Sequence, residues 1–179
     1  MSNRNLLFSG FGGQGILFTG KFIAYKSLLE DKNVSWLPSY GPEMRGGTAS
    51  CSVIVGDEPV GSPIVSKPDV LVAMNLPSLD RFENSVKSGG MIFADSSLID
   101  RKVKRDDVTV YYIPATGLAS ENDIPTLANM IIAGKMMKVF DEFDENMVET
   151  TLKKIISKRK ADLFDYNLKA IKIGVNYQD

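Results

Sequence analysis

Two glycine-rich segments contain the residues whose types and spacing could do chemistry in this chain. In the first, Gly10, Gly12 and Gly15 fill a G-x-G-x-x-G frame, with Gly13 and Gln14 between them. A strand, a tight glycine turn and a helix start leave free backbone N–H groups, which can cradle a phosphate or a carboxylate. The same glycines can instead serve only to make a sharp turn. The frame therefore predicts either an anion cradle or a strand-to-helix turn.

The second segment follows a short apolar run and contains a permanently charged side chain. Its candidate site residues are Tyr40, Gly41, Glu43, Arg45, Gly46 and Gly47. Arg45 can offer a planar fork to a carboxylate, a phosphate or a diphosphate, and Glu43 can orient it. The alternative is a Glu43–Arg45 or intersubunit ion pair that only holds the loop. Tyr40 at the rim and Gln14 in the first loop can contact a ligand or be structural.

A nicotinamide cofactor is not expected at the first glycine loop. Dinucleotide-binding folds usually carry an Asp or Glu about twenty residues after the glycines, where it binds the ribose hydroxyls. Here the second apolar run, residues 34–38, ends in Ser39 and Tyr40. The acidic residue that would select a ribose is therefore missing from its usual place.

The elements that must position these loops alternate between strands and helices. We expect strands at 6–8, 34–38, 48–55, 60–65, 69–74, 91–94 and 108–113, and helices at 16–31, 77–88, 124–140, 147–156 and 164–175. The run 69–74 is continuously apolar, as in a strand covered on both faces. The pattern predicts a single α/β domain with a mostly parallel sheet and helices on both faces, Rossmann-like, and the two glycine loops at the carboxyl ends of its strands.

Composition bounds the function independently of these motifs. The chain has 179 residues, of which 44% are hydrophobic and 24% charged, and its net charge is -1. Such a balance gives no electrostatic reason for binding nucleic acid or an acidic membrane surface. No apolar run approaches the ~20 residues of a membrane span, so we expect a cytoplasmic protein that meets no membrane.

The counts of cysteine and histidine exclude several chemistries for the chain alone. Cys51 is the one cysteine, and there is no histidine. An iron–sulfur cluster usually needs four thiolates, and structural zinc needs several Cys or His ligands. Nucleophile–histidine arrangements are excluded as well. We therefore assign no catalytic residue and no metal site to this chain, and we expect Cys51 to be a buried, apolar side chain.

Several motifs in one order resemble a known family over most of the chain. They are G-F-G-G-Q-G-I from Gly10, P-S-Y-G-P-E-M-R-G-G from Pro38, S-P at Ser62, P-D-V-L-V-A from Pro68, I-P-A-T from Ile113, and A-N-M at Ala128 with Gly134. Together they resemble the gamma subunit of 2-oxoacid:ferredoxin (acceptor) oxidoreductases. The P-E-M-R-G-G form resembles the 2-oxoglutarate and branched-chain members more than the pyruvate members. The resemblance implies that residues 1–179 form one pyruvate/ketoisovalerate oxidoreductase gamma-type domain.

The resemblance also implies a division of labour among subunits. Such enzymes use thiamine diphosphate and magnesium to decarboxylate a 2-oxoacid, pass electrons through iron–sulfur clusters to ferredoxin, and release an acyl-coenzyme A. The partners are alpha and beta subunits, and the resemblance leaves open a further, ferredoxin-like delta subunit. Thiamine diphosphate, magnesium and clusters are expected in those partners, with coenzyme A as co-substrate and no cofactor bound by this chain alone. The two glycine loops are then expected to shape access for coenzyme A, to contact partner subunits, or to do both.

Two other functions remain as alternatives. One is a Rossmann-type nucleotide-binding enzyme that acts alone, which the missing ribose-binding acid and the missing histidine disfavour. The other is the corresponding subunit, named beta, of an indolepyruvate oxidoreductase. That subunit would share the loops but serve a different substrate.

Overall fold

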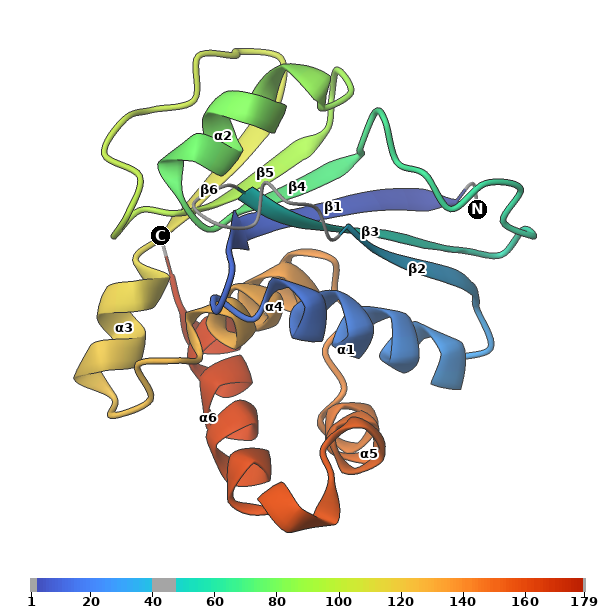
Figure 1. Ribbon diagram of the computed structural model, residues 1–179, viewed down its shortest axis with the longest axis vertical. Coiled ribbons are helices and arrows are strands. Elements are labelled where there is room, and N and C mark those ends of the chain that lie inside the picture. The colour runs from blue at the N-terminus through green and yellow to red at the C-terminus, as the bar shows by residue number, and fades with distance from the viewer. Residues whose placement is uncertain (1–2, 40–47, 179) are drawn as a thin grey trace.

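The structure is a computed structural model that describes residues 3–39 and 48–178 (Figure 1). Within these residues six strands form one sheet in the order β2-β3-β1-β4-β5-β6. The strands are β1 (Arg4–Phe11), β2 (Asn33–Ser39), β3 (Thr48–Gly56), β4 (Val70–Ala73), β5 (Met91–Asp95) and β6 (Thr109–Ile113). The helices are α1 (Ile16–Leu29), α2 (Leu76–Phe82), α3 (Ala115–Glu121), α4 (Ala128–Val139), α5 (Glu145–Ile155) and α6 (Asp162–Asn176). Short 3-10 turns follow α2 at Glu83–Ser85 and α5 at Lys158–Lys160.

The sheet is mostly parallel, as the sequence predicts. β1, β2, β4, β5 and β6 run in one direction, and β3 alone runs the opposite way, pairing antiparallel with β1 on one side and with β2 on the other. The connections between β4, β5 and β6 are parallel crossovers, the first through α2 and the second through a segment without a helix. Every residue of β4 is buried, which confirms the prediction from its continuous apolar run.

Helices cover the two faces of the sheet unequally. On one face, α1, α4, α5 and α6 pack over a large core that includes Phe8, Phe22 and Phe93 (Figure 1). On the other face, α2 and the connection between β5 and β6 pack over a smaller core that includes Leu71 and Ile92. α4 lies inside the larger layer, where each residue from Ala128 to Met137 is buried. Its apolarity all round is explained by this burial.

Three local features differ from the sequence expectation. Residues 60–65 form no strand in the described structure, because β3 already pairs with β1 and β2 along both of its edges. The helix expected over 77–88 ends at Phe82, where a 3-10 turn takes over and Arg105 binds the carbonyl oxygens of Glu83 and Val86. The short helix α3 was not expected. None of the helices within 3–39 and 48–178 is long and apolar enough to cross a membrane.

Candidate functional site

The candidate site lies at the carboxyl ends of β1 and β4, which are neighbours in the sheet. The chain leaves β1 for α1 on one face and leaves β4 for α2 on the other face (Figure 1). This divergence makes a topological switch point, the place where open α/β sheets usually bind ligands. The first glycine loop, residues 10–15, lies at this point, as the sequence predicts.

The packing of the fold itself requires glycine at two positions of this loop. A Cβ added to Gly10 would lie 2.7 Å from Gln14 Oε1 and 2.9 Å from Met74 Cβ, so only glycine lets β1 end against β4. Gly15 has a φ of 74° and is the N-cap of α1, and a Cβ there would overlap the side-chain amide of Asn129. A Cβ on Gly12 would meet nothing within 4 Å. The open side of the loop is therefore at Gly12, and the side facing the protein is filled.

Gln14 fills the crevice between the two strand ends. Its Oε1 accepts hydrogen bonds from the backbone N of Phe11 at 2.6 Å and from Asn75 Nδ2 at 3.2 Å, and its Nε2 donates to Met74 O at 3.2 Å. Asn75 in turn caps α2 by accepting from the backbone N of Ser78 at 2.9 Å. The Gln14 amide is thus engaged with the neighbouring loop, which is the structural alternative left open by the sequence.

Two further polar clusters at this edge were not identified from the sequence. Ser9 Oγ donates to Ala49 O at 3.1 Å and lies 3.0 Å from Ser78 Oγ, which ties β1 to β3 and α2. At the end of β5, the buried carboxylate of Asp95 accepts from Thr116 Oγ1 at 2.5 Å and from the backbone N of Ser97. The sequence signal that could have identified Asp95 is its position, directly after a buried apolar run at the carboxyl edge of the sheet.

The surface beside the open side of the loop is apolar. A hollow of about 270 Å³ is lined by Phe11, Gly12, Gly13, Gly15, Ile16, Leu17, Phe18 and Ala49. Phe11 is 41% exposed, and the first turn of α1 has no acidic residue. The N-terminus of α1 offers backbone donors here, but the side chains around them are hydrocarbon. Such a surface suits a partner protein or an apolar part of a ligand better than a bare phosphate.

The chain's own residues do not fit the metal groups implied by the resemblance. Within the described ranges, no three His, Cys, Asp or Glu side chains gather where they could hold a metal ion. Cys51 is completely buried between β1 and β2, and burial raises the pKa of its thiol to about 12. A neutral, buried thiol is a poor ligand and a poor nucleophile.

The remaining candidate residues lie outside the described part of the chain. They are the residues of the second glycine-rich segment, Tyr40, Gly41, Glu43, Arg45, Gly46 and Gly47. Their flanks are placed: β2 ends at Ser39 and β3 begins at Thr48, and these residues belong to neighbouring antiparallel strands at the same end of the sheet. Their roles stay predictions from the sequence.

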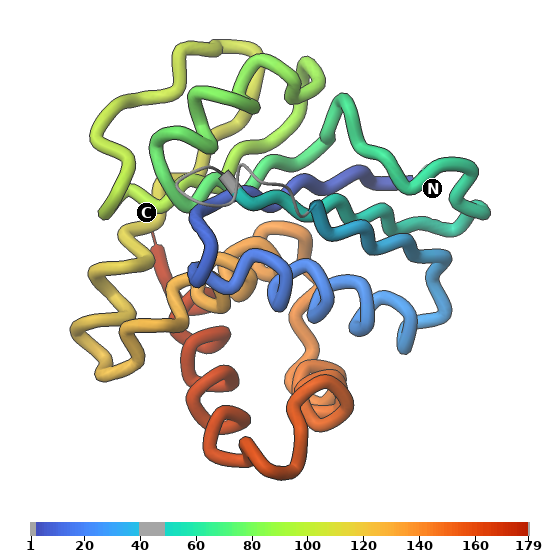
Figure 2. The backbone as a smooth tube through the Cα atoms, viewed as in Figure 1, coloured from blue at the N-terminus to red at the C-terminus, as the bar shows by residue number. Residues whose placement is uncertain are grey.

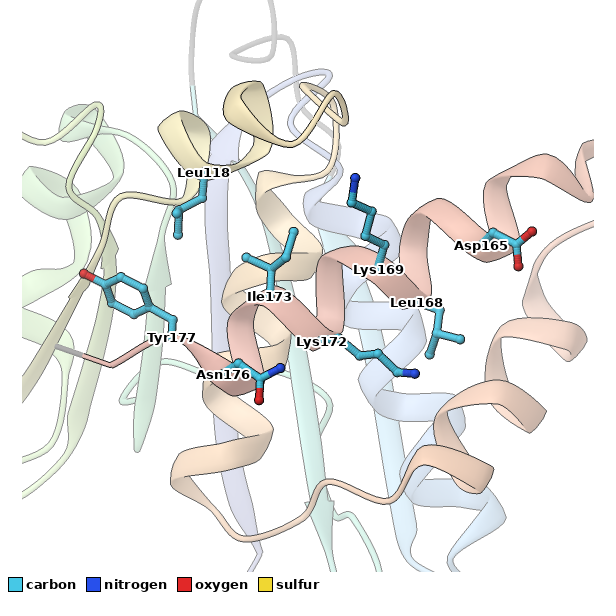
Figure 3. Close-up of a pocket in the computed structure, with 8 residues that line it drawn as sticks. All are labelled: Leu118, Asp165, Leu168, Lys169, Lys172, Ile173, Asn176 and Tyr177. Carbon is cyan, nitrogen blue, oxygen red and sulfur yellow. The ribbon is translucent and has the colours of Figure 1, made fainter.

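A larger hollow lies elsewhere, on the helical layer. It measures about 610 Å³ and runs along α6, with Leu118 of α3 on one side and Tyr177 at one end (Figure 3). Its two lysines are already bound, since Lys169 donates to Asn122 O at 2.7 Å and Lys172 to Glu145 at 2.5 Å. It shares no lining residue with the glycine loop and is not part of the candidate site.

Comparison with known protein families shows to which family this chain belongs. The family model described as pyruvate ferredoxin/flavodoxin oxidoreductase matches residues 5–177. The chain belongs to this family. It is 39% identical over 170 residues to the ketoisovalerate oxidoreductase subunit VorA of Methanothermobacter marburgensis, an alignment that covers 94% of this chain and 35% of the relative. It is 35% identical over 152 residues to the 2-oxoglutarate synthase subunit KorC of Methanocaldococcus jannaschii, covering 83% of this chain and 81% of that one.

Solved structures of the family share the fold. The keto/oxoacid ferredoxin oxidoreductase gamma subunit from Geobacter sulfurreducens superimposes with a TM-score of 0.83 at 25% identity, over 97% of this chain and 95% of that chain. The 2-oxoglutarate:ferredoxin oxidoreductase of Magnetococcus marinus gives a TM-score of 0.86 at 24% identity, over 98% of this chain and 31% of that chain. The chain therefore spans about a third of the length of the VorA relative, while its match to KorC covers about four fifths of each chain.

Proposed function

We propose that this chain is the gamma-type subunit of a 2-oxoacid:ferredoxin oxidoreductase, with residues 1–179 forming its one gamma-type domain. The observation that carries the proposal is the combination of the family match over residues 5–177 with relatives of the same extent that are named as subunits. A 2-oxoacid of the 2-oxoglutarate or branched-chain kind is the proposed substrate of the whole enzyme, after the names of the KorC and VorA relatives.

In this proposal the chemistry belongs to partner subunits. Thiamine diphosphate with magnesium would supply the carbanion chemistry of decarboxylation, and iron–sulfur clusters would carry the electrons to ferredoxin. This chain has one cysteine and no histidine, so its own residues cannot supply a cluster's ligands. Its role is to present the carboxyl edge of its sheet, with the glycine loop and the apolar rim at Phe11, to the active site or to the route of coenzyme A.

The internal hydrogen bonds of the glycine loop also support this role. A dinucleotide would need the crevice between β1 and β4 for its diphosphate, and Gln14 occupies that crevice with bonds to Phe11, Met74 and Asn75. A free-standing nucleotide enzyme is therefore the less favoured function.

Affinity capture of the tagged chain from its native source tests the proposal. We expect recovery of subunits that carry a thiamine diphosphate motif and cluster-ligating cysteines, together with coenzyme A-dependent oxidation of a 2-oxoacid by the assembly. The chain purified alone should be inactive and colourless. A visible cluster absorption band or 2-oxoacid oxidation from the single chain would contradict the assignment. Oxidation of indolepyruvate alone by the captured assembly would favour the indolepyruvate oxidoreductase instead.

A thermal-shift measurement separates the nucleotide alternative. A ligand at a hundredfold excess over its dissociation constant stabilises a protein by ~2.7 kcal/mol. NAD and NADP at millimolar concentration should leave the melting temperature of the isolated chain unchanged. A clear increase with either would support the nucleotide enzyme.

A further inference from the structure

One row of side chains across the sheet shows where its helical cover stops. On the face that carries α2, Leu37 of β2 pairs with Ser52 of β3, which pairs with Leu7 of β1, then with Leu71 of β4 and Ile92 of β5. Leu71 and Ile92 are completely buried, Leu7 is 5% exposed, and Leu37 is 38% exposed. In this row the buried side chains end at β1, whereas further along the same face Ile54 of β3, which pairs with Asn5, is 5% exposed.

On the opposite face the cover extends to β3. The next row, Cys51, Phe8, Val72 and Phe93, is paired strand to strand from β3 to β5 and is at most 2% exposed throughout. α1 covers this side of β2 and β3, and a Cβ on its Gly20 would lie 3.2 Å from Trp36 Nε1. Trp36 on the α1 side of the edge strand β2 is 38% exposed as well, so among the described residues the two faces differ at β3, where Cys51 on the α1 side is buried and Ser52 on the α2 side is partly exposed.

A hollow of about 500 Å³ lies on the α2 side of β2 and β3. It is lined by Leu7, Leu37, Pro38, Ser39, Ser50, Ser52, Ile64, Val65, Ser66, Arg81, Phe82 and Ser85. α2 forms one wall, and the connection 57–69, which rises above the sheet on the α2 side, forms the other (Figures 1 and 2). At its mouth Ile64 is 69% exposed, the largest exposed fraction among the big apolar side chains described. Serine hydroxyls between the apolar walls supply hydrogen-bonding groups.

The edge strand β2 beside this hollow indicates which kind of secondary-structure element can bind there. Strand addition at the free edge of β2 is disfavoured because Pro38 has no N–H to donate, and prolines in sheets occupy outward-facing edge positions for this reason. That removes pairing of β2 with β2 of a second copy as the simple solution. The faces of mostly parallel sheets are instead covered by helices, and within residues 3–39 and 48–178 no helix lies beside α2 over β2 and β3.

The relatives indicate where such a helix comes from. In VorA and in the Magnetococcus marinus structure this domain makes up 35% and 31% of a much longer chain. In these relatives the domain is therefore joined to a larger body, and under the proposed function that body belongs to a partner subunit. The geometry points to the hollow between α2 and β2 as the docking site for one amphipathic helix of that larger partner subunit, apolar where it meets Leu37 and Ile64 and hydrogen-bonded to the serine hydroxyls. This inference rests on the proposed function.

Paired substitutions test the docking site in the assembly captured from the native source. Leu37→Glu combined with Ile64→Glu places two charges on exposed positions of the hollow, so the isolated chain should keep its melting temperature. Assembly with the larger subunit, measured by titration of the purified subunits, should weaken about tenfold to hundredfold. The matched control is Leu98→Glu with Leu163→Glu, at 43% and 40% exposure away from the hollow, which should assemble like the wild type.

A photo-reactive benzoylphenylalanine in place of Ile64 identifies the occupant. We expect a cross-link between this position and a helix of the larger subunit. That subunit corresponds to the part of VorA that lies outside the region aligned with this chain. Normal assembly of the Leu37/Ile64 double variant, or a cross-link only to a second copy of this chain, overturns the docking site and leaves the proposed function standing. Failure of the wild-type chain to assemble with any such subunit overturns both.

Discussion

Asn129 of α4 donates through Nδ2 to the carbonyl oxygen of Gly15 at 3.1 Å and to Thr19 Oγ1 at 2.9 Å. The side chain is 3% exposed, so this amide connects the buried centre of the helical layer directly to the end of the glycine loop. Asn129 thus satisfies a buried backbone carbonyl at the start of α1. The loop is thereby fixed from both sides, by Asn129 at Gly15 and by Gln14 at Met74 and Asn75.

Replacing Gly15 with alanine should destabilise the domain strongly. The left-handed backbone costs a non-glycine residue roughly 1–2 kcal/mol, and the new methyl group overlaps the Asn129 amide. We expect a loss of about 2–5 kcal/mol in the free energy of unfolding, measured by urea denaturation. Gly12→Ala, whose methyl group meets open space, should change it by less than about 0.5 kcal/mol. Equal effects of the two substitutions would contradict the described packing.

Cys51 should resist alkylation in the native protein. Its thiol is buried, and burial raises its pKa from the ordinary value of 9.0 to about 12. At pH 8 the reactive thiolate is then about a thousandfold scarcer than in the unfolded chain, apart from the steric block. Iodoacetamide labelling followed by mass spectrometry should therefore report global unfolding, with complete labelling in guanidinium chloride. Fast labelling without denaturant would show that β3 opens locally.

Gly20 and Cys51 should be energetically coupled. A Cβ on Gly20 overlaps Cys51 Sγ, so Gly20→Ala alone should cost about 1–3 kcal/mol despite the better helix propensity of alanine. Cys51→Ala removes the sulfur and leaves room for the methyl group. The double variant should be at least about 1 kcal/mol more stable than the sum of the two single losses implies. Strict additivity in urea unfolding would mean that α1 shifts away from β3 to accept the alanine.

The sequence was sufficient for those parts of the fold in which local pattern and burial agree. β4 is continuously apolar because both of its faces are covered, and α4 is apolar all round because it lies within the helical layer. The turn between β1 and α1 was predictable because glycine is required at its positive φ angles. In each case the same residues specify the local structure and its place in the core.

The rest depended on pairings between residues far apart in the chain. Residues 60–65 have the composition of a strand, yet both edges of β3 are already occupied, and no local signal reports that. The helix after β4 ends early because Arg105, more than twenty residues downstream of Phe82, binds carbonyls beyond its end. The hydrogen-bond partners of Gln14, Met74 and Asn75, belong to another crossover unit, so its structural role could not be predicted from the loop alone.

Low pH should weaken the packing of the β5–β6 connection on the α2 face of the sheet, because it protonates Asp107. Arg105 binds its carboxylate at 2.8 and 2.6 Å, and this hydrogen-bonded pair lowers the pKa of Asp107 from 3.8 to about 2. Because the pKa in the folded state is depressed, the stabilisation is present above pH ~4 and is lost as the pH falls toward 2. Asp107→Asn should lower the melting temperature at pH 6, and the difference from wild type should vanish near pH 2. Asp106→Asn removes the same charge at the neighbouring position and leaves the Arg105–Asp107 pair intact, so at pH 6 it should change the melting temperature less than Asp107→Asn.

Arg45 should matter to the assembled enzyme more than to the folding of this chain. If its guanidinium anchors an anionic group or the wall of the partner's active site, Arg45→Lys keeps the charge but loses the planar, two-pronged donor. Loss of such a charge-assisted contact costs about 1.5–3 kcal/mol, roughly a tenfold to hundredfold change in affinity. The change should appear in the Michaelis constant for coenzyme A, or in the affinity between subunits, while the melting temperature of the isolated chain stays the same.

The variant Glu43→Gln distinguishes an anchoring role of Arg45 from an ion pair that only holds the loop. If the two residues only form an internal ion pair, Glu43→Gln removes it and Arg45→Lys keeps a weaker one, so the melting temperature would fall a little, mainly in Glu43→Gln, and the kinetics would stay near normal in both variants. An anchoring Arg45 instead makes the kinetics or the assembly of the two variants differ. Arg45→Lys raises the Michaelis constant or weakens assembly, whereas Glu43→Gln, which leaves the guanidinium in place, has the smaller effect. Matching, near-normal kinetics and assembly in both would reduce Arg45 to a residue that holds its own loop.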